Sequence, residues 1–129
     1  MEYPNKDLTE QIIKIAINIH KALGPGFIEK VYQRALYLDL KRSPLKFERE
    51  KTIEIRYKGI NLGYEKVDFI IENKVVLELK TVSEIQEIHK AQILSYLKAG
   101  NCRIGLILNF AKPILEIKRI VYDTARYQR

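Results

Sequence analysis

The stretch from residue 67 to residue 80 constrains the fold most, because two apolar runs flank a polar centre at Asn73. This pattern predicts two strands joined by a tight turn. Asp68 and Glu78 stand equally far from Asn73 along the chain. An odd-numbered turn would bring the two carboxylates face to face with Cβ atoms ~5 Å apart, whereas an even-numbered turn would place them on opposite faces. Lys80 shares the face of Glu78 in either case.

Asp68, Glu78 and Lys80 would then converge inside an apolar hairpin. Two unscreened carboxylates would repel each other there, and burial would raise their pKa values. A bound Mg²⁺ would resolve this conflict, because it prefers oxygen ligands and keeps several waters. The alternative is an ordinary cross-strand ion pair of Asp68 with Lys80, with Glu78 in solvent. The apolar neighbours weigh against that alternative, since an unpartnered charge among them is costly.

Hydrophobic periodicity divides the remaining chain into helices and strands. Their order, α-α-β-β-β-α-β-β, predicts an α/β sandwich around a mixed central sheet, formed by a single domain over residues 1–129. The predicted helices span Leu8–Leu23, Ile28–Arg42 and Ile85–Ala99, and the predicted strands span Phe47–Tyr57, Leu62–Ile71, Val75–Lys80, Arg103–Asn109 and Ile114–Tyr122.

The pattern also predicts details of the helices. Asp7 or Thr9 is expected to cap the first helix. The second helix should contact the core through apolar residues that include Leu36, Leu38 and Leu40. The third helix should place one apolar stripe in the core and turn a separate polar and aromatic face elsewhere. The stripe consists of Ile88, Ala91, Leu94 and Leu97, and the other face consists of His89, Gln92 and Tyr96.

Composition narrows the class of protein. The chain has 23 Lys and Arg residues against 16 Asp and Glu residues, a net charge of +7. This excess favours polyanionic partners without identifying them. No apolar run approaches the about 18 residues of a membrane span, and the polar N-terminus is unlike a signal peptide. A single cysteine can form neither an internal disulfide nor a cysteine metal site, so we expect a cytoplasmic protein without membrane association.

Two motifs carry a resemblance to known families. Asp68, followed after a hairpin by Glu78-Leu79-Lys80, resembles the D…ExK core of the PD-(D/E)XK nuclease superfamily, with Val67 in place of its proline. The run from Gly26 to Tyr32 reads G-x-x-E-x-x-Y, the signature of the GxxExxY protein family, which is similar to the same superfamily. The resemblance runs from about residue 8 to residue 121 and implies a restriction-endonuclease-like fold.

The resemblance implies a nuclease that depends on Mg²⁺ or Mn²⁺ and hydrolyses phosphodiester bonds. DNA is the expected substrate, because most of the superfamily acts on DNA. Asp68 and Glu78 would hold the metal, and Glu29 would add a contact directly or through water. Lys80 and Gln92 would position the attacking water and the phosphate.

Other side chains are candidates for supporting the site or contacting phosphate. Tyr32 is expected to pack with its hydroxyl on a carboxylate, with contact to a phosphate as the alternative. The same supporting class includes His89, Tyr96 and Lys98. Basic residues elsewhere could contact a phosphate backbone. They are Lys41, Arg42, Arg49, Lys51, Arg56, Lys58, Lys112, Lys118 and Arg119.

Two further interpretations stay open. The chain could be a catalytically weak or inactive module that binds nucleic acid or protein on the same fold. It could also be a structural protein whose charged triplet is only an ion-pair cluster. A homodimer is consistent with the nuclease interpretation, since small nucleases often need two copies to grip both strands.

Overall fold

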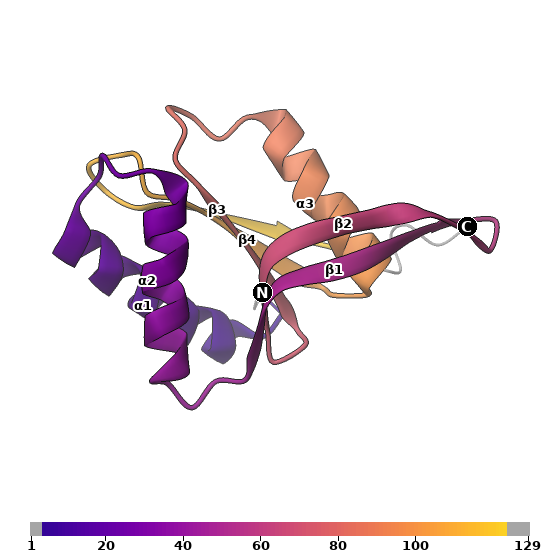
Figure 1. Ribbon diagram of the computed structural model, residues 1–129, viewed down its shortest axis with the longest axis horizontal. Helices are drawn as coiled ribbons and strands as arrows, with labels where there is room; N and C mark the ends of the chain where they lie inside the picture. Colours follow the sequence, from indigo (N-terminus) through magenta and orange to yellow (C-terminus); the bar gives the residue numbers. More distant parts are fainter. Residues whose placement is uncertain (1–3, 124–129) are drawn as a thin grey trace.

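The structure, a computed structural model, describes residues 4–123 as three helices and five strands in the predicted order (Figure 1). Two strands keep their predicted bounds, and the other elements shift at their ends by at most two residues. The elements are α1 Lys6–Leu23, α2 Glu29–Lys41, β1 Phe47–Tyr57, β2 Ile60–Ile71, β3 Val75–Lys80, α3 Glu87–Gly100, β4 Ile104–Asn109 and β5 Glu116–Val121.

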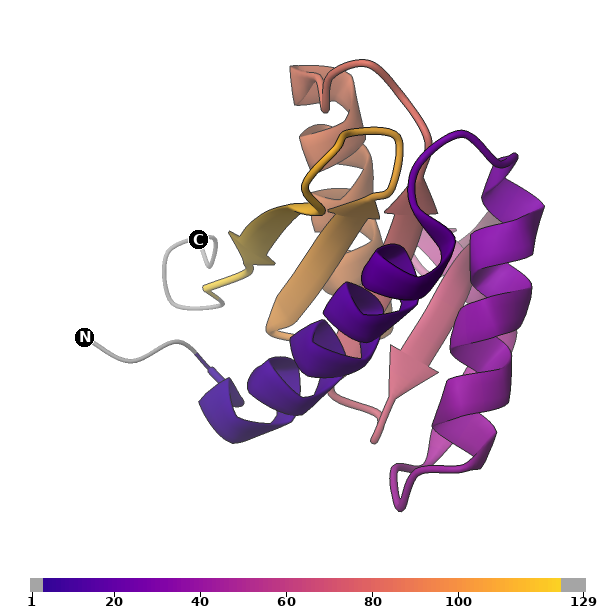
Figure 2. The same ribbon diagram turned by 90° about the vertical axis from the view of Figure 1, so that its left-hand side faces the viewer.

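The strands form one mixed sheet in the order β1-β2-β3-β4-β5. Neighbouring strands are antiparallel except β3 and β4, which run parallel and are connected through α3. Helices α1 and α2 cover one face of the sheet, and α3 covers the other (Figure 2). This arrangement confirms the predicted α/β sandwich with a mixed central sheet flanked by helices.

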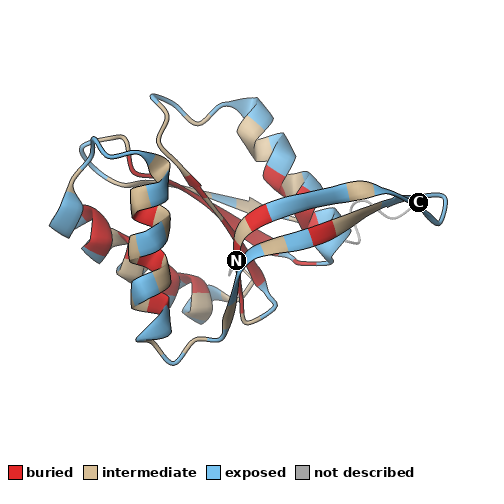
Figure 3. Cartoon of the chain, in the orientation of Figure 1, coloured by how far each residue is buried: buried red, intermediate tan, exposed pale blue. Residues whose placement is uncertain are grey.

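Each face of the sheet has its own hydrophobic core, because successive side chains of a strand point to opposite faces. On β3, Leu77 and Leu79 pack towards α1 and α2, whereas Val76 packs towards α3. Every residue of β4 is buried. Figure 3 shows the buried residues concentrated in the strands between the helices. The end of β3 is therefore held from both sides, which gives its charged side chains a rigid support.

Two predicted details of α1 and α2 are wrong. Asp7 and Thr9 lie inside α1, because the helix begins two residues earlier than predicted. The residue before the helix, Asn5, adopts a left-handed conformation and makes no side-chain cap hydrogen bond. The Thr9 hydroxyl instead donates to the carbonyl oxygen of Lys6 at 3.0 Å. On α2, Leu38 is 48 % exposed and does not belong to the core.

The buried stripe of α3 also differs from the prediction. Ile88 is 66 % exposed and Ala91 is exposed, whereas the buried residues of the helix are Ile93, Tyr96 and Leu97. Apolar residues occur on all sides of this helix, so their spacing does not select one face. No helix within residues 4–123 combines the length and the apolar character that a membrane span requires.

Candidate metal centre

The turn between β2 and β3 fixes the register of the two predicted carboxylates. It has three residues, 72–74, so the odd-numbered turn is confirmed. Glu72 and Asn73 both adopt the left-handed conformation, with φ of 54° and 55°. Backbone pairing continues away from the turn as far as Phe69 opposite Leu77. Asp68 and Glu78 are the next opposed residues, where the two strands stop pairing.

Hydrogen bonds from two elements hold the Asp68 carboxylate. Its Oδ2 accepts the backbone N–H of Leu79 at 2.8 Å. This contact lies just beyond the last backbone pair of β2 with β3, so the Asp68 side chain connects the two strands where their pairing ends. Its Oδ1 accepts the Nε2–H of Gln33 on α2 at 2.9 Å. Hydrogen bonds to a charged group are worth about 1.5–3 kcal/mol each, enough to fix one orientation of the carboxylate.

Gln33 connects Asp68 to Glu29, the carboxylate predicted on the second helix. Its Nε2 also lies 3.4 Å from Oε2 of Glu29, because residues four apart share one face of a helix. Glu29 is the first residue of α2, where the helix dipole favours a negative charge. Sequence reasoning missed Gln33, although its position four residues after Glu29 was a signal that could have found it.

Glu78 is the least satisfied group of the centre. Its Oε1 is buried and has no hydrogen-bond partner within residues 4–123. Burial raises the pKa of Glu78 to about 9, the neighbouring Asp68 adds to the increase, and Lys80 opposes it. Burial also raises the pKa of Glu29, with a further contribution from the charge of Asp68. The centre therefore gathers carboxyl groups in a place where burial disfavours the charged forms of Glu29 and Glu78.

The ion-pair alternative is not what the structure shows. Among residues 4–123, no ion pair within 4.0 Å joins Asp68 to Lys80. Glu78 is partly buried and does not project into solvent. Lys80 lowers the pKa of both Glu78 and Glu29 through its charge. It therefore acts on the carboxylates as a nearby cation without neutralising any one of them.

A divalent cation fits the donor atoms of this centre. The unpartnered Oε1 of Glu78 lies beside a second carboxylate, and Mg²⁺ is commonly bound through one or two carboxylates with water completing its shell. Within the described part of the chain, no three His, Cys, Asp or Glu side chains gather closely enough to ligate one ion. Asp68 and Glu78 would be the two residues that hold such an ion. Glu29 could reach the ion through water.

In the described part of the chain, Gln92 makes no direct contact with the carboxylates through a hydrogen bond, so its predicted role stays a prediction. Gln92 lies on the exposed side of α3, and no hydrogen bond within residues 4–123 joins it to Asp68 or Glu78. His89 is committed to the beginning of the helix, where its Nδ1 accepts the backbone N–H of Gln86 at 3.0 Å. The structure therefore gives His89 a capping role, and the predicted contacts of both residues with water or phosphate stay predictions.

Tyr96 and Tyr32 occupy two different environments. Burial raises the pKa of the Tyr96 hydroxyl, and the charge of Glu78 raises it further, so this tyrosine senses the carboxylates from α3. Tyr32 is fully buried, and its hydroxyl donates to the carbonyl oxygen of Gly24 at 2.6 Å. Its ring stacks on Phe110 with centroids 4.5 Å apart. Tyr32 thus holds the loop between α1 and α2, which leads directly into Glu29.

Asn109 holds the loops at the same end of the sheet. Its side chain is completely buried, and its Nδ2 donates to the carbonyl oxygen of Val82 at 2.8 Å and to Glu116 at 3.0 Å. Its Oδ1 accepts the backbone N–H of Val82 at 3.1 Å. In Figure 2 the loops that follow α1, β3 and β4 lie together at this end. The end of β3 that carries Glu78 and Lys80 is thereby held in place.

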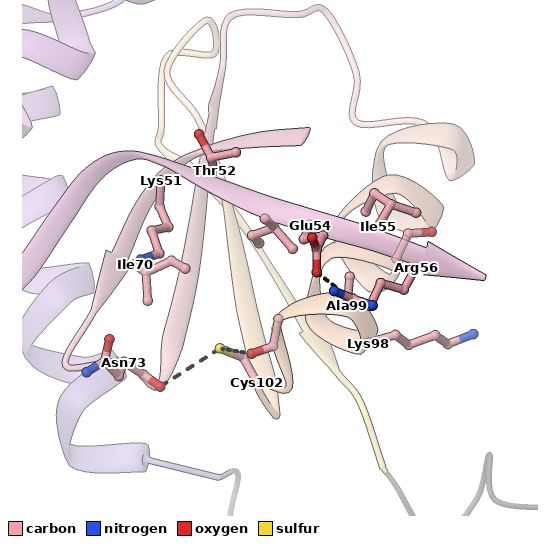
Figure 4. A pocket seen from close by; sticks show the side chains of 13 residues that line it. Lys51, Thr52, Glu54, Ile55, Arg56, Ile70, Asn73, Lys98, Ala99 and Cys102 are labelled. Atoms are coloured by element: carbon pink, nitrogen blue, oxygen red, sulfur yellow. Dashed lines mark hydrogen bonds and ion pairs between the residues drawn. The ribbon is translucent and has the colours of Figure 1, made fainter. Parts of the chain in front are cut away.

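A groove of about 730 Å³ lies away from the carboxylates. It runs between β1 and the C-terminal half of α3 (Figure 4). Lys98, predicted as a supporting residue, lines this groove together with Lys51 and Arg56. Its volume alone does not identify it as the chemical centre, because the buried unpartnered carboxylate lies elsewhere.

Comparisons with known proteins agree with this geometry. The family model described as the PD-(D/E)XK nuclease superfamily matches residues 6–120. No curated protein sequence matches the chain. A crystal structure of SSO0001 aligns with a TM-score of 0.58 and 23 % identity over 75 % of this chain and 52 % of the other. This chain therefore spans about half the length of that protein.

A second crystal structure, an alkaline exonuclease (LHK-Exo) from Laribacter hongkongensis, has the same fold. It aligns with a TM-score of 0.53 and 12 % identity, over 98 % of this chain and 74 % of the other. These identities support the fold alone, whereas the family model covers almost all of the described residues. The chain belongs to the PD-(D/E)XK nuclease superfamily.

Proposed function

We propose that the chain is a nuclease that depends on a divalent metal and hydrolyses phosphodiester bonds in nucleic acid. The observation that carries this proposal is the buried, unpartnered Oε1 of Glu78 beside Asp68. A structural role would leave such an atom paired, because an unsatisfied buried polar group costs about 1–3 kcal/mol. The G-x-x-E-x-x-Y run of residues 26–32 supports membership of the GxxExxY family as part of the same proposal.

The proposal assigns each side chain a task that its position allows. Asp68 and Glu78 hold Mg²⁺ or Mn²⁺, and Gln33 keeps Asp68 oriented while restraining Glu29. When bound, the ion would lower the pKa of a coordinated water and offset negative charge on the phosphate. Lys80 orients a water at the carboxylates and lowers the cost of bringing a phosphate to them.

The substrate is proposed at two levels. Nucleic acid follows from the superfamily, whose members generally use divalent metals, and from the net charge of +7. DNA is the first substrate to test, because most of the superfamily acts on it. The name of the similar solved protein, an alkaline exonuclease, makes exonuclease action on DNA ends a specific version of the proposal.

The experiment is cleavage of single-stranded, duplex and branched DNA in the presence of Mg²⁺ or Mn²⁺. We expect metal-dependent cleavage that Glu78→Gln and Lys80→Ala abolish. The matched control is Glu54→Gln, which alters another Glu-x-basic sequence on a strand and should cleave like the wild type. Cleavage that survives Glu78→Gln or Lys80→Ala would contradict the assignment of this site.

A binding module without catalysis is the second candidate function. The exposure of Gln92 favours it, because no hydrogen bond within residues 4–123 joins this glutamine to Asp68 or Glu78. This candidate predicts affinity for nucleic acid that does not change when Mg²⁺ is added or chelated. Calorimetry that detects no divalent-ion binding, together with such affinity, would support the module over the nuclease.

A further inference from the structure

Helix α2 carries a line of basic side chains next to the candidate site. Lys30, Arg34, Tyr37 and Lys41 are spaced at i, i+4, i+7 and i+11, so they lie along one side of the helix. Each of these residues comes one position after a residue of a second row, which begins with Glu29 and packs on the sheet. One residue is a rotation of about 100°, which turns the basic line towards solvent. Lys30, Arg34 and Lys41 are all exposed.

Tyr37 gathers two cations at the far end of this line. Its ring packs edge-on against Phe47 with centroids 5.8 Å apart, which anchors it to the core. The Lys41 ammonium lies 5.3 Å from the ring centroid, and the Arg49 guanidinium of β1 lies 4.5 Å from it. Cation–π contacts of this kind are worth about 0.5–1 kcal/mol at exposed sites. They hold two like charges near each other on the surface.

Ion pairs with carboxylates neutralise several of the other surface cations, although not all of them. Lys51 pairs with Glu48 at 2.8 Å, Lys112 pairs with Glu116 at 3.4 Å, and Arg56 pairs with Glu54. Within residues 4–123, no carboxylate lies within 4.0 Å of the three cations of the α2 line or of Arg49 on β1. We call these four the α2 basic row: Lys30, Arg34, Lys41 and Arg49.

We propose that the α2 basic row binds the phosphate backbone of the nucleic acid on which the candidate site acts. The proposal rests on the proposed function and adds the direction in which the substrate leaves the centre. The row begins one residue from Glu29 and follows the helix for about 16 Å, at 1.5 Å per residue. A line of unneutralised cations fits a line of phosphates, because release of condensed counterions drives such binding. The shared chemistry, a phosphodiester backbone, occurs in DNA and RNA.

Binding measured without catalysis tests this surface. Affinity for duplex DNA and for single-stranded RNA is followed by fluorescence anisotropy against salt concentration, with EDTA present so that nothing is cleaved. The row variant carries Lys30→Gln, Arg34→Gln, Lys41→Gln and Arg49→Gln. The control carries four substitutions of paired cations, Lys6→Gln, Lys51→Gln, Arg56→Gln and Lys112→Gln. Each variant removes four positive charges from the net charge of +7.

The row variant should bind at least tenfold more weakly than the control at moderate salt. Each lost phosphate contact should reduce the slope of log affinity against log salt by about 0.9 on duplex DNA and about 0.7 on a single strand. Arg34→Gln alone, at an exposed position, should reduce the slope by about one contact, which protects the test if the quadruple variant misfolds. The nucleic acid with the larger loss is the better ligand of the row.

Two results would overturn the proposal: equal losses in the row variant and the control, or tighter binding of polyglutamate than of either nucleic acid. The second result would indicate an acidic protein partner. Binding through the row without any Mn²⁺-dependent cleavage would refute the proposed function and leave this inference intact. Metal-dependent cleavage by the wild type, together with an unchanged salt dependence of binding in the row variant, would support the proposed function and refute this inference.

Discussion

Strands β1, β3 and β5 carry the same short pattern, a glutamate followed two residues later by a basic residue, and the patterns of β1 and β3 lie in opposite environments. Glu54 and Arg56 of β1 are paired near the surface, and Glu54 also accepts the side-chain N–H of Asn61 at 2.6 Å. The hydrogen bond from Arg56 lowers the pKa of Glu54. Burial and Asp68 raise the pKa of Glu78. The spacing is therefore common to a solvated ion pair and to a candidate metal centre.

The difference lies in what surrounds each glutamate. On β1, the Glu54 carboxylate finds its partners within the hairpin of β1 and β2, where Arg56 and Asn61 both donate hydrogen bonds to it. Glu78 instead faces a second carboxylate at the end of a central strand, and Lys80 relieves that repulsion only in part. A site arises where the fold buries like charges together, since natural proteins retain such conflicts mainly at functional positions.

Cleavage should separate the two glutamates most strongly. Glu78→Gln removes a proposed metal ligand and should lower the rate by roughly 10³-fold, since electrostatic stabilisation at a single position can be worth that much. Glu54→Gln should leave the rate within about twofold, because its partners lie in the β1–β2 ribbon. Single-turnover cleavage of the best DNA substrate measures both. Similar losses in the two variants would remove the basis of the comparison.

Stability against pH should separate them in sign. In the metal-free protein the folded Glu78 carboxyl keeps its proton to about pH 9, against an ordinary value of 4.5. Its contribution is therefore fully present below about pH 4.5 and is lost as pH rises to about 9, at up to about 1.4 kcal/mol per pH unit. Glu78→Gln should thus raise the melting temperature at pH 8 and have little effect at pH 4.

Glu54 should behave in the opposite way, because its pKa is lowered in the folded state. Its contribution is present above its ordinary pKa and is lost as pH falls through the lowered value. Glu54→Gln should therefore lower the melting temperature slightly at pH 7, and the difference should disappear in acid. Melting curves of both variants in EDTA from pH 3 to pH 9 give the comparison. The same dependence of melting temperature on pH in both variants would contradict the predicted opposite signs.

Gln33→Leu tests how much of the site depends on orientation. The variant keeps the volume of the side chain but releases Asp68 and Glu29 from their shared donor. Partners that orient metal ligands typically contribute 10–100-fold to metal affinity, so we expect a loss of about tenfold. Gln33→Glu is the contrasting variant, because a carboxylate at this position cannot donate a hydrogen bond and should weaken binding further. Mn²⁺ affinity unchanged in Gln33→Leu would limit Gln33 to packing.

Tyr32→Phe should have the smallest effect of this series. Its hydroxyl donates to Gly24 and accepts the backbone N–H of Phe27 at 3.2 Å, so its loss should cost about 1 kcal/mol of unfolding free energy. Stacking on Phe110 is retained, and cleavage should stay within a few-fold of the wild type. Denaturant unfolding measures the first quantity. A large loss of cleavage without loss of stability would place the hydroxyl in the chemistry.

Local pattern was enough to predict the hairpin that carries the centre. The apolar runs on both sides of Asn73 and the three-residue turn fix which side chains oppose each other, and one register satisfies both. The alternation along Phe47–Tyr57 likewise gave the bounds of β1. Both results depend on contacts between residues close in sequence.

Features that depend on distant contacts were not predictable in the same way. Gln33 becomes part of the centre only because α2 packs where β2 and β3 separate, 35 residues away in sequence from Asp68. The buried face of α3 was predicted wrongly. Apolar side chains project from several sides of this helix, and its packing on the sheet determines which of them are buried. The sequence also does not show which cations are neutralised by ion pairs. Arg56 pairs with Glu54, and Asn61 on the neighbouring strand donates a hydrogen bond to the same glutamate.

Calorimetric titration of the metal-free protein with Mn²⁺ at pH 7 tests the central claim most directly. We predict that about one ion binds per chain and that a proton is released to the buffer, because Glu78 must ionise to become a ligand. The measured heat should therefore change with the ionisation enthalpy of the buffer, and Glu78→Gln should abolish binding. No binding to the wild-type protein, or equal binding to Glu78→Gln, would contradict the claim that Asp68 and Glu78 form a metal centre.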